Sequence, residues 1–305
     1  MIDYSKYLKK DSVIIFLFHG VIDKNPFKIR NYNNKHLLAS DFTKVLNILK
    51  KKGNCISMDE VYERIKTKKK FSNYSFAITF DDGFYNNFKI AIPILIKKKL
   101  KATFYITSNF IEKNSMSWVD KIEYMIENIS DTKILSIFNS KFIIHSNMKS
   151  KIEFLKKIRI LAKQKKNIDL DLLVGTIKKQ LKFKKRIGNL KNILDRKMNW
   201  KNIKKINSNN LFLIGGHTQN HKILSFLNNK SCNSEIEKCI STIKNKTNIS
   251  LEHFSYPEGL KHTYGNREIK ILKKNKIKIC PSAEFGFNDT KSNLFHLKRV
   301  IVDKI

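Results

Sequence analysis

Short apolar runs that end in polar or charged residues recur along this chain of 305 residues. The first run, 13–18, is followed by His19, and the second, 76–80, is followed by Asp81 and Asp82. Runs of five or six β-forming residues are typical of buried strands. In parallel α/β sheets, ligands bind at the carboxyl ends of the strands. The pattern therefore predicts a functional site at that edge of a sheet.

Helical patterns alternate with these strands. Apolar residues at helical spacing predict helices over 40–52, 88–100, 230–246 and 267–274. Further apolar runs predict strands over 101–107, 211–214, 254–257, 277–280 and 295–302. A strand, a helix and a second strand at this spacing form a βαβ unit, in which the two strands are parallel. The succession predicts an α/β fold built on a parallel sheet.

The strand at 76–80 carries candidate chemistry at its end. Because side chains alternate along a strand, Asp81 and Asp82 point in different directions, so that one can bind a metal while the other transfers protons. The strand at 211–214 leads through two glycines to His217 and His221. Histidines four apart lie on one face if the segment makes a helical turn. With a carboxylate they form three ligands that leave positions open, which is typical of a catalytic metal.

Three segments in this order resemble the polysaccharide deacetylase family, which is carbohydrate esterase family 4 with NodB homology. They are T-F-D-D-G at 79–83, H-T-Q-N-H at 217–221 and F-S-Y-P-E-G at 254–259. Weaker similarities lie at W-V-D-K-I-E-Y (118–124), M-N-W (198–200) and L-K-R-V (297–300), so the likeness runs from about residue 13 to the C-terminus. The resemblance implies a distorted (β/α) barrel that hydrolyses the N-acetyl group of a sugar.

The middle of the chain departs from that resemblance. Compact members of the family separate the aspartate and histidine motifs by fewer residues. Here the intervening sequence has lysine-rich helical patterns at 118–129, 151–166, 170–181 and 189–195, with a short strand signal at 134–144. We therefore expect a single domain, 1–305, with a mainly helical insertion at about 112–197. A lid, a substrate-selecting wall, an interface between subunits and a membrane-facing surface all fit such an insertion.

The resemblance also assigns roles to the first two motifs. It implies Asp82, His217 and His221 as metal ligands and Asp81 as the general base. The cofactor is then a divalent metal ion, with zinc expected first and cobalt, nickel or manganese as alternatives. Thr218 matches a hydroxyl residue that orients the ligands, and a helix N-cap is its plain structural alternative.

The third motif matches a segment whose backbone N–H binds the oxyanion in the family, which here is the N–H of Glu258. Tyr256 and Pro257 are then expected at the substrate, and the Glu258 side chain is expected to contact the sugar. Many members have an arginine two residues before that proline, paired with the catalytic aspartate, where this chain has Ser255. Arg299 is a candidate substitute for that arginine.

Two histidines compete for the role of general acid. His296 lies in an L-x-H pattern, 294–296, that supplies the protonating histidine in much of the family. His19 is the second candidate, and we expect it to line the pocket as a substrate or proton contact because it ends the first strand.

Composition and charge add a compartment and a set of partners. The chain has 61 Lys and Arg against 26 Asp and Glu, a formal net charge of +35. The lysines are spread evenly, which favours compositional drift, although an anionic membrane surface is a candidate second partner and no specific nucleic acid is expected. Four scattered cysteines favour a reducing compartment. The run at 13–18 is too short for a signal peptide, so we expect a cytoplasmic protein, peripheral at the inner membrane surface if it meets a membrane.

The sequence thus predicts a metal-dependent carbohydrate N-deacetylase, a hydrolase of C–N bonds other than peptide bonds. Its expected substrate is an N-acetylated carbohydrate or glycolipid, in a surface glycan or its lipid- or nucleotide-linked precursor. No oligomeric state is predicted. One alternative keeps the barrel and the metal but acts on another acyl group or C–N bond. A second is a non-catalytic protein that binds an anionic polymer or membrane, although the four intact motif residues speak against it.

Overall fold

Parallel strands run through the centre of the computed structural model, which describes residues 3–164, 168–188 and 192–303. Five strands lie side by side in the order β10 (Arg299–Ile301), β1 (Val13–Phe18), β5 (Ser75–Phe80), β6 (Ala102–Ile106) and β9 (Phe212–Gly216). Each is parallel to its neighbour, and the short β4 (Asn54–Cys55) pairs with the start of β5. The expected parallel sheet is therefore present, and all these strands present their carboxyl ends at one edge.

Beyond β9 the sheet closes on itself. Three isolated parallel bridges continue it: Gly216 with Phe254, His253 with Ile279, and Pro281 with Leu297. Leu297 leads directly into β10, so the circle is complete and the fold is the predicted distorted (β/α) barrel. The strands predicted at 254–257 and 277–280 are reduced to single bridged residues. Pro257 has no N–H to donate to a ladder, which limits the first of these strands, whereas Pro281 itself forms the bridge to Leu297.

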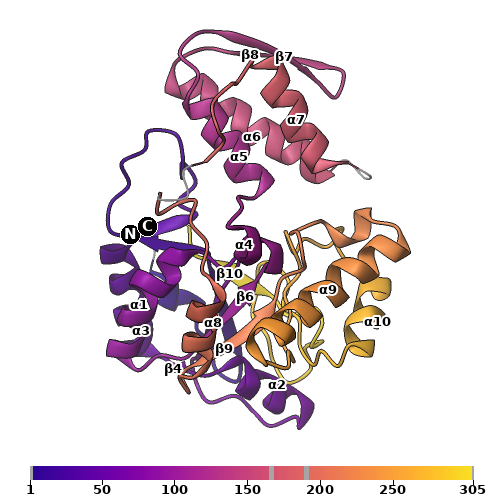
Figure 1. Ribbon diagram of the computed structural model, residues 1–305. Coiled ribbons are helices and arrows are strands. Elements are labelled where there is room, and N and C mark those ends of the chain that lie inside the picture. The colour runs from indigo at the N-terminus through magenta and orange to yellow at the C-terminus, as the bar shows by residue number, and fades with distance from the viewer. Residues whose placement is uncertain (1–2, 165–167, 189–191, 304–305) are drawn as a thin grey trace.

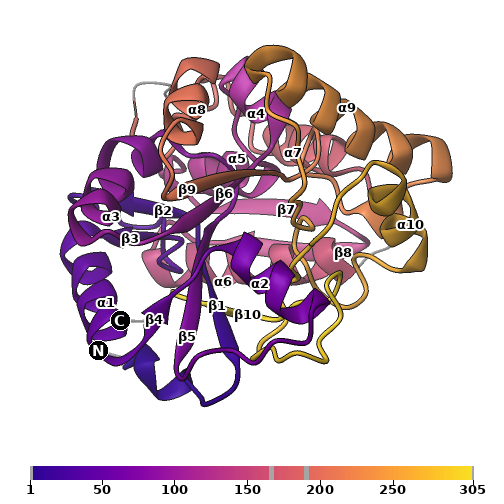
Figure 2. The ribbon, with the colours of Figure 1, turned by 90° about the horizontal axis from the view of Figure 1, so that it is seen from below.

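Helices cover the outside of the barrel (Figure 2). They are α1 (Ala39–Lys52), α2 (Met58–Lys66), α3 (Ile92–Lys98), α4 (Ser108–Lys113), α8 (Trp200–Asn207), α9 (Asn229–Thr247) and α10 (Asn266–Lys274). Shorter elements are the 3-10 helices η1 (Tyr4–Tyr7) and η3 (Leu224–Phe226) and the parallel pair β2 (Gly20–Ile22) and β3 (His36–Leu38). The helix predicted over 88–100 begins as a π-helical segment, η2 (Asn87–Ala91), and continues as α3. Pro93 cannot donate an N–H to the preceding turn, which accounts for the change of winding.

Stacked aromatic rings pack between the carboxyl ends of the central strands and the outer helix α1. The ring of Phe80 lies 5.4 Å from that of Phe18 and 5.0 Å from that of Phe104, and both pairs are stacked. All three residues are at most 1% exposed. Phe18 and Phe80 immediately precede His19 and Asp81, so close packing of the rings fixes the backbone from which those two side chains project.

A second, smaller part of the molecule lies above the barrel (Figure 1). We call it the cap, and it consists of α5 (Trp118–Glu127), the antiparallel hairpin of β7 (Lys133–Ile137) and β8 (Ser140–Ile144), α6 (Met148–Gln164) and α7 (Leu170–Gln180). The cap has an apolar core of its own, in which Ile126, Leu135, Ile158 and Ile177 are fully buried. It lies within the segment expected as a mainly helical insertion.

Two predicted helices of that segment extend past the described residues. Residues 165 and 166 of the predicted helix 151–166 lie outside them, as do 189–191 of the predicted helix 189–195. Residues 192–195 form a turn, not a helix, because the side chain of Asn192 accepts the N–H of Leu194 and its carbonyl accepts that of Asp195. The predicted helix at 192–195 is therefore wrong.

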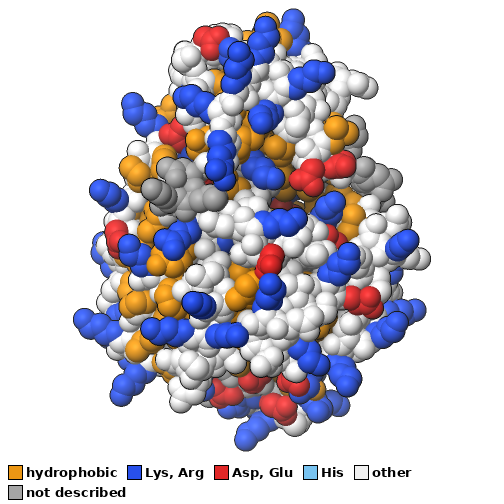
Figure 3. Space-filling model, in the orientation of Figure 1, with side chains coloured by type: hydrophobic (Ala, Val, Ile, Leu, Met, Phe, Trp, Pro, Cys, Tyr) orange, Lys and Arg blue, Asp and Glu red, His pale blue; other side chains and the backbone are white. Residues whose placement is uncertain are grey.

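Lys and Arg side chains are spread over both the cap and the barrel on the face shown in Figure 3. Along the described stretches of the chain, every helix is too short or too polar to cross a bilayer. The even spread of charge on this face does not distinguish compositional drift from an anionic membrane partner as the reason for the net charge.

Candidate metal and catalytic site

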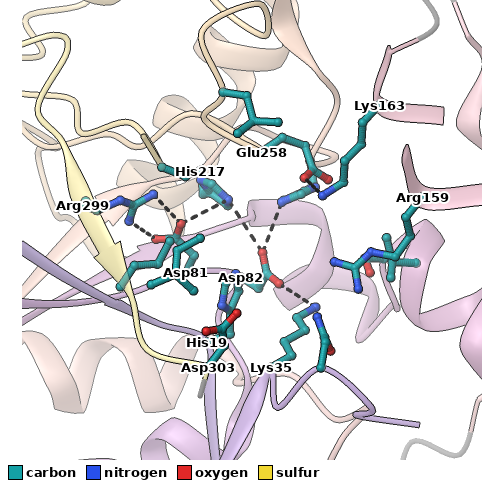
Figure 4. Close-up of a pocket in the computed structure, with 18 of the residues that line it drawn as sticks. His19, Lys35, Asp81, Asp82, Arg159, Lys163, His217, Glu258, Arg299 and Asp303 are labelled. Carbon is teal, nitrogen blue, oxygen red and sulfur yellow. Dashed lines mark hydrogen bonds and ion pairs between the residues drawn. The ribbon is translucent and has the colours of Figure 1, made fainter. Parts of the chain in front are cut away.

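The backbone turns sharply where β5 ends. Asp82 has φ 74° and Gly83 has φ 75°, so two successive residues adopt the left-handed conformation. A β-carbon at position 83 would also lie 2.9 Å from the side chain of Ile111, which explains the glycine. The turn directs the carboxylates of Asp81 and Asp82 into one pocket above the strand ends (Figure 4).

The two histidines reach that pocket from the loop after β9. The segment 217–221 is not helical, so the helical turn considered from the sequence is not the arrangement. Thr218 and His221 instead have φ 63° and 57°, and the Thr218 hydroxyl accepts the N–H of His221 at 2.9 Å. This loop brings the rings of His217 and His221 to 4.9 Å between centroids. Thr218 therefore orients a ligand candidate by shaping the loop, and it does not cap a helix.

Asp82, His217 and His221 offer three ligand atoms within 4.8 Å of one another. The Nε2 atoms of His217 and His221 lie 3.7 and 3.3 Å from Oδ1 of Asp82. Within the described parts of the chain, that oxygen is buried without a hydrogen-bond donor. A buried carboxylate oxygen facing two imidazole nitrogens is costly unless a cation lies between them.

The partner of the opposite ring nitrogen supports the same conclusion. His217 Nδ1–H donates to the carbonyl oxygen of Ser255 at 2.9 Å, which leaves the Nε2 lone pair directed at Asp82. Burial lowers the pKa of His217, so its neutral form, which is the form that binds metals, is favoured. The donor set of two imidazoles and one carboxylate fits a divalent transition metal such as zinc.

Asp81 is held by the guanidinium of Arg299. Nη1 and Nη2 of Arg299 each donate to one oxygen of Asp81 at 2.9 Å, and both side chains are at most 4% exposed. Burial raises the pKa of Asp81, but the charge and hydrogen bonds of Arg299, together with His217 and His19, hold that pKa below its ordinary value. The Ser255 hydroxyl also lies 3.4 Å from Asp81. Arg299 thus lies where the sequence analysis expected a substitute for the family's arginine.

Lys35 is a site residue that the sequence analysis did not identify. Its ammonium lies 3.1 Å from Asp82 Oδ2 and 3.2 Å from Asp120 Oδ1. Burial would raise the pKa of Asp82, but Lys35 and then His221 hold it well below its ordinary value. No short-range pattern distinguishes Lys35 from the many other lysines of the chain. It differs from them only in the folded protein, where α5 brings Asp120 beside it. Asp120 lies in one of the weaker stretches of resemblance.

Arg159 and Lys163 on α6 of the cap also line the pocket, and they too were missed. Lys163 forms an ion pair with Glu258, and this pair links the cap to the third motif (Figure 4). Burial would raise the pKa of Glu258, but Lys163, with smaller contributions from His221 and Arg159, lowers that pKa to about 2. Glu258 has φ 61°, and its N–H has no acceptor among the described residues. A free N–H in a pocket wall is the feature expected of an oxyanion donor.

His19 lines the pocket, as expected. Burial lowers the pKa of His19 to about 4, so its imidazole is neutral at pH 7. The structure does not bring His296 to the same place. That side chain is exposed, its Nδ1 lies 3.2 Å from the hydroxyl of Tyr264, and it is not among the residues lining the pocket. The side chain after Phe295 points outward because Phe295 itself points into the core, so the general-acid assignment of His296 is corrected.

Tyr256 and Pro257 have a structural environment. Tyr256 borders the pocket, but it is 1% exposed, stacks on Tyr264 at 3.8 Å and donates its hydroxyl to the carbonyl of Phe295. Pro257 is buried and is not among the lining residues. The structure therefore does not bring Pro257 to the pocket wall, and Tyr256 borders the pocket with its hydroxyl already bonded to Phe295.

Comparisons with known proteins cover most of the chain. A family model described as "Polysaccharide deacetylase" matches residues 68–169 and 173–279, more than half of the sequence. A search of curated proteins gave no match.

Three solved structures match nearly the whole chain. The deacetylase PplD from Streptococcus pyogenes, in complex with acetate, has a TM-score of 0.62 at 15% identity and covers 96% of this chain and 93% of its own. IcaB from Ammonifex degensii has a TM-score of 0.61 at 13% identity, over 97% and 94%. A de-N-acetylase from Aggregatibacter actinomycetemcomitans has 0.61 at 13%, over 96% and 95%. At these identities the likeness shows a shared fold, and it extends over the cap.

Proposed function

Since this chain belongs to the polysaccharide deacetylase family, we propose that it is a metal-dependent hydrolase of the N-acetyl group of a sugar. The substrate is an N-acetylated carbohydrate in a surface glycan or in its lipid- or nucleotide-linked precursor. Water and the sugar acetamide give acetate and the sugar amine. The observation that carries the proposal is one pocket in which Asp82, His217 and His221 face a common point beside Asp81.

Asp82, His217 and His221 would hold the metal. The order of preference is zinc, then cobalt, nickel or manganese, because imidazole nitrogens suit these ions. A divalent ion bound there supplies Lewis acidity toward water and toward the carbonyl oxygen of the acetamide. Lys35 holds the second oxygen of Asp82, which keeps the carboxylate turned so that Oδ1 faces the histidines.

Asp81 is the proton acceptor in this proposal. Arg299 keeps it ionised in a buried site and fixes the plane of its carboxylate through two hydrogen bonds. An ionised carboxylate that cannot rotate can take a proton from an attacking water without first reorienting.

Two further groups act on the amide. The N–H of Glu258 can donate to the oxyanion that develops as water attacks the carbonyl carbon of the acetamide. The proton that Asp81 takes from this water must reach the departing nitrogen, and His19 is the group through which it does so. Its pKa is low in the resting pocket because of burial, and negative charge developing nearby raises the affinity of the imidazole for a proton.

The proposal includes a location. Four free cysteines, three of them buried, are suited to a reducing compartment, so we place the reaction in the cytoplasm, with the membrane surface as a second partner.

Acetate release tests this function. The purified protein is stripped with a chelator, reloaded with zinc and incubated with N-acetylated sugars and glycolipids, with Asp81→Asn as the catalytic control. We expect release only from the metal-loaded protein with Asp81 intact, and one bound metal per chain. A loaded protein that releases a different acyl product would favour the alternative hydrolase. A protein that binds no metal would refute the site assignment.

A further inference from the structure

Helix α6 of the cap presents two cations to the catalytic pocket. Arg159 and Lys163 are four residues apart, so they lie one above the other on the same face of the helix. Both line the pocket that holds Asp81 and Asp82, and their side chains are 22% and 21% exposed. Figure 4 shows both reaching from the side of α6 toward the interior of the pocket. Their positive charge therefore faces the space that a substrate enters.

The carboxyl end of α6 is fixed to the barrel. Lys163 pairs with Glu258, and its carbonyl oxygen accepts a hydrogen bond from Nε2 of His262 at 2.8 Å. Glu258 belongs to the third motif, and His262 lies in the loop that follows it. The two cations are consequently held at a set position relative to the metal ligands, with little freedom for the helix to withdraw.

Arg159 has unused hydrogen-bonding capacity. Its Nη1 lies 3.4 Å from the hydroxyl of Tyr32 and 3.8 Å from Oε1 of Glu123, both long contacts. In the described portion of the chain, Nε and Nη2 have no acceptor. A guanidinium carries five N–H donors in a rigid fork that matches the oxygens of a phosphate. One edge of this fork is thus available to a ligand.

The other cations of the pocket are already paired. Arg299 makes two hydrogen bonds to Asp81, Lys35 lies between Asp82 and Asp120, and Lys163 has Glu258. Arg159 has only the two long contacts, to the Tyr32 hydroxyl and to Glu123. The charged side chains that line the pocket otherwise balance, with Lys35, Arg159, Lys163 and Arg299 against Asp81, Asp82, Glu258 and Asp303. The weakly paired guanidinium of Arg159 is therefore the place in this pocket where a negatively charged group of a substrate would be bound.

We propose that Arg159 and Lys163 form a subsite for a phosphate ester on the N-acetylated sugar. This inference rests on the proposed function and narrows it to substrates in which the acetamide and the phosphate belong to the same sugar unit. Arg159 binds two phosphate oxygens through its free edge, and Lys163 divides its charge between the phosphate and Glu258. The phosphate ester belongs to a nucleotide-linked or a lipid-linked sugar, and the two sources share this chemistry.

Paired substrates test the subsite. For the zinc-loaded enzyme, kcat/KM is measured with N-acetylglucosamine 1-phosphate and with the neutral methyl glycoside of N-acetylglucosamine, and the ratio defines the phosphate preference. We expect Arg159→Gln to lower that ratio roughly tenfold to hundredfold, the size of a lost charged hydrogen bond. Arg159→Lys keeps the charge without the fork and should give an intermediate ratio. Lys157→Gln, an exposed lysine two residues earlier on α6, is the matched control for net charge.

A change of opposite sign separates this role from a structural one. Glu258→Gln removes the partner of Lys163 and leaves the lysine's charge free for the phosphate. The ratio of kcat/KM for the phosphorylated sugar to that for the neutral sugar should therefore rise in Glu258→Gln, whereas it should fall in Arg159→Gln. Salt should reduce the preference in both cases. Equal losses with both substrates in Arg159→Gln, or a fall of the ratio in Glu258→Gln, would overturn the subsite. Uridine diphosphate N-acetylglucosamine and a short-chain prenyl diphosphate sugar then distinguish the two sources.

Binding separates failure of the subsite from failure of the proposed function. Calorimetric titration of chelator-treated protein with the same two sugars needs no turnover. Tighter binding of the phosphorylated sugar that is lost in Arg159→Gln would support the subsite even if no acetate is ever released. Acetate release with no difference between the two sugars would support the hydrolase and refute the subsite.

Discussion

Replacing Arg299 with glutamine should remove the support of Asp81, the proposed proton acceptor. The change removes both hydrogen bonds to Asp81 and leaves a carboxylate that is 4% exposed without a cation. Removing one partner of a buried pair costs about 3–5 kcal/mol, a large part of the roughly 5–15 kcal/mol that stabilises a typical domain. We expect the free energy of unfolding at pH 7 to fall by about that amount, and acetate release to fall with it.

The loss of stability in Arg299→Gln should depend on pH. The folded-state pKa of Asp81 lies below its ordinary value of 3.8, so the pair contributes its full stability above that pH and loses it as the pH falls further. The deficit of Arg299→Gln should therefore be largest at neutral pH and shrink toward pH 3. In kcat/KM, the acid limb should move to higher pH because burial then raises the pKa of Asp81 unopposed.

Urea unfolding of metal-free protein measures the stability, and a double-mutant cycle with Asp81→Asn isolates the pair. An amide at position 81 needs no cation, so the double variant should be more stable than the sum of the single losses predicts, by about 2 kcal/mol or more. Arg64→Gln, which removes a guanidinium from the outer helix α2, is the control. A loss below about 1 kcal/mol in Arg299→Gln, or additive losses in the cycle, would refute the account of Asp81 given above.

Three further results follow from the structure. Lys163→Gln should lower the free energy of unfolding at pH 6 and have little effect near pH 2, because Lys163 helps to hold the pKa of Glu258 at about 2. Urea titrations at several pH values measure this, and an equal loss at all pH values would contradict it. Gly259→Ala should cost about 1–3 kcal/mol, since φ is 59° and the new β-carbon would lie 2.5 Å from the backbone nitrogen of Ala283, whereas Gly175→Ala in α7, where a β-carbon meets nothing, should stabilise by about 0.5–1 kcal/mol. Zinc added to chelator-treated protein should raise the melting temperature, and this rise should disappear in His221→Ala.

The parallel sheet and the candidate ligand set could be predicted because both follow from local patterns, whereas the closure of the sheet into a barrel was expected only from the family resemblance. The strand at 76–80 and its two aspartates form one continuous signal, and so do the strand at 211–214 and the two histidines. The loop around Thr218 was not predictable in detail, because a positive φ at Thr218 and His221 has no strong sequence signature outside glycine. The helical turn considered for this segment was wrong, but the candidate ligand set is unchanged, because a metal depends on where the side chains lie and not on the path of the backbone.

Residues contributed by distant segments were harder to find. Lys35, Arg159 and Lys163 are ordinary lysine and arginine positions among 61 basic residues, and only the tertiary fold makes them part of the pocket. Arg299 was found because this chain has Ser255 where many family members have the arginine that pairs with the catalytic aspartate, so another arginine had to be sought. His296 was assigned from a three-residue pattern, too short to specify which side of a chain faces the pocket.

The separate apolar core of the cap has a consequence for how this protein can diverge. The cap is folded around Ile126, Leu135, Ile158 and Ile177, and it lines the pocket with the start of α5 and one face of α6. Substitutions at those two places can change which molecules are accepted while the barrel, with its stacked aromatic rings and its candidate metal ligands, keeps the same sequence. Selection on substrate range and selection on chemistry thus act on different stretches of the gene.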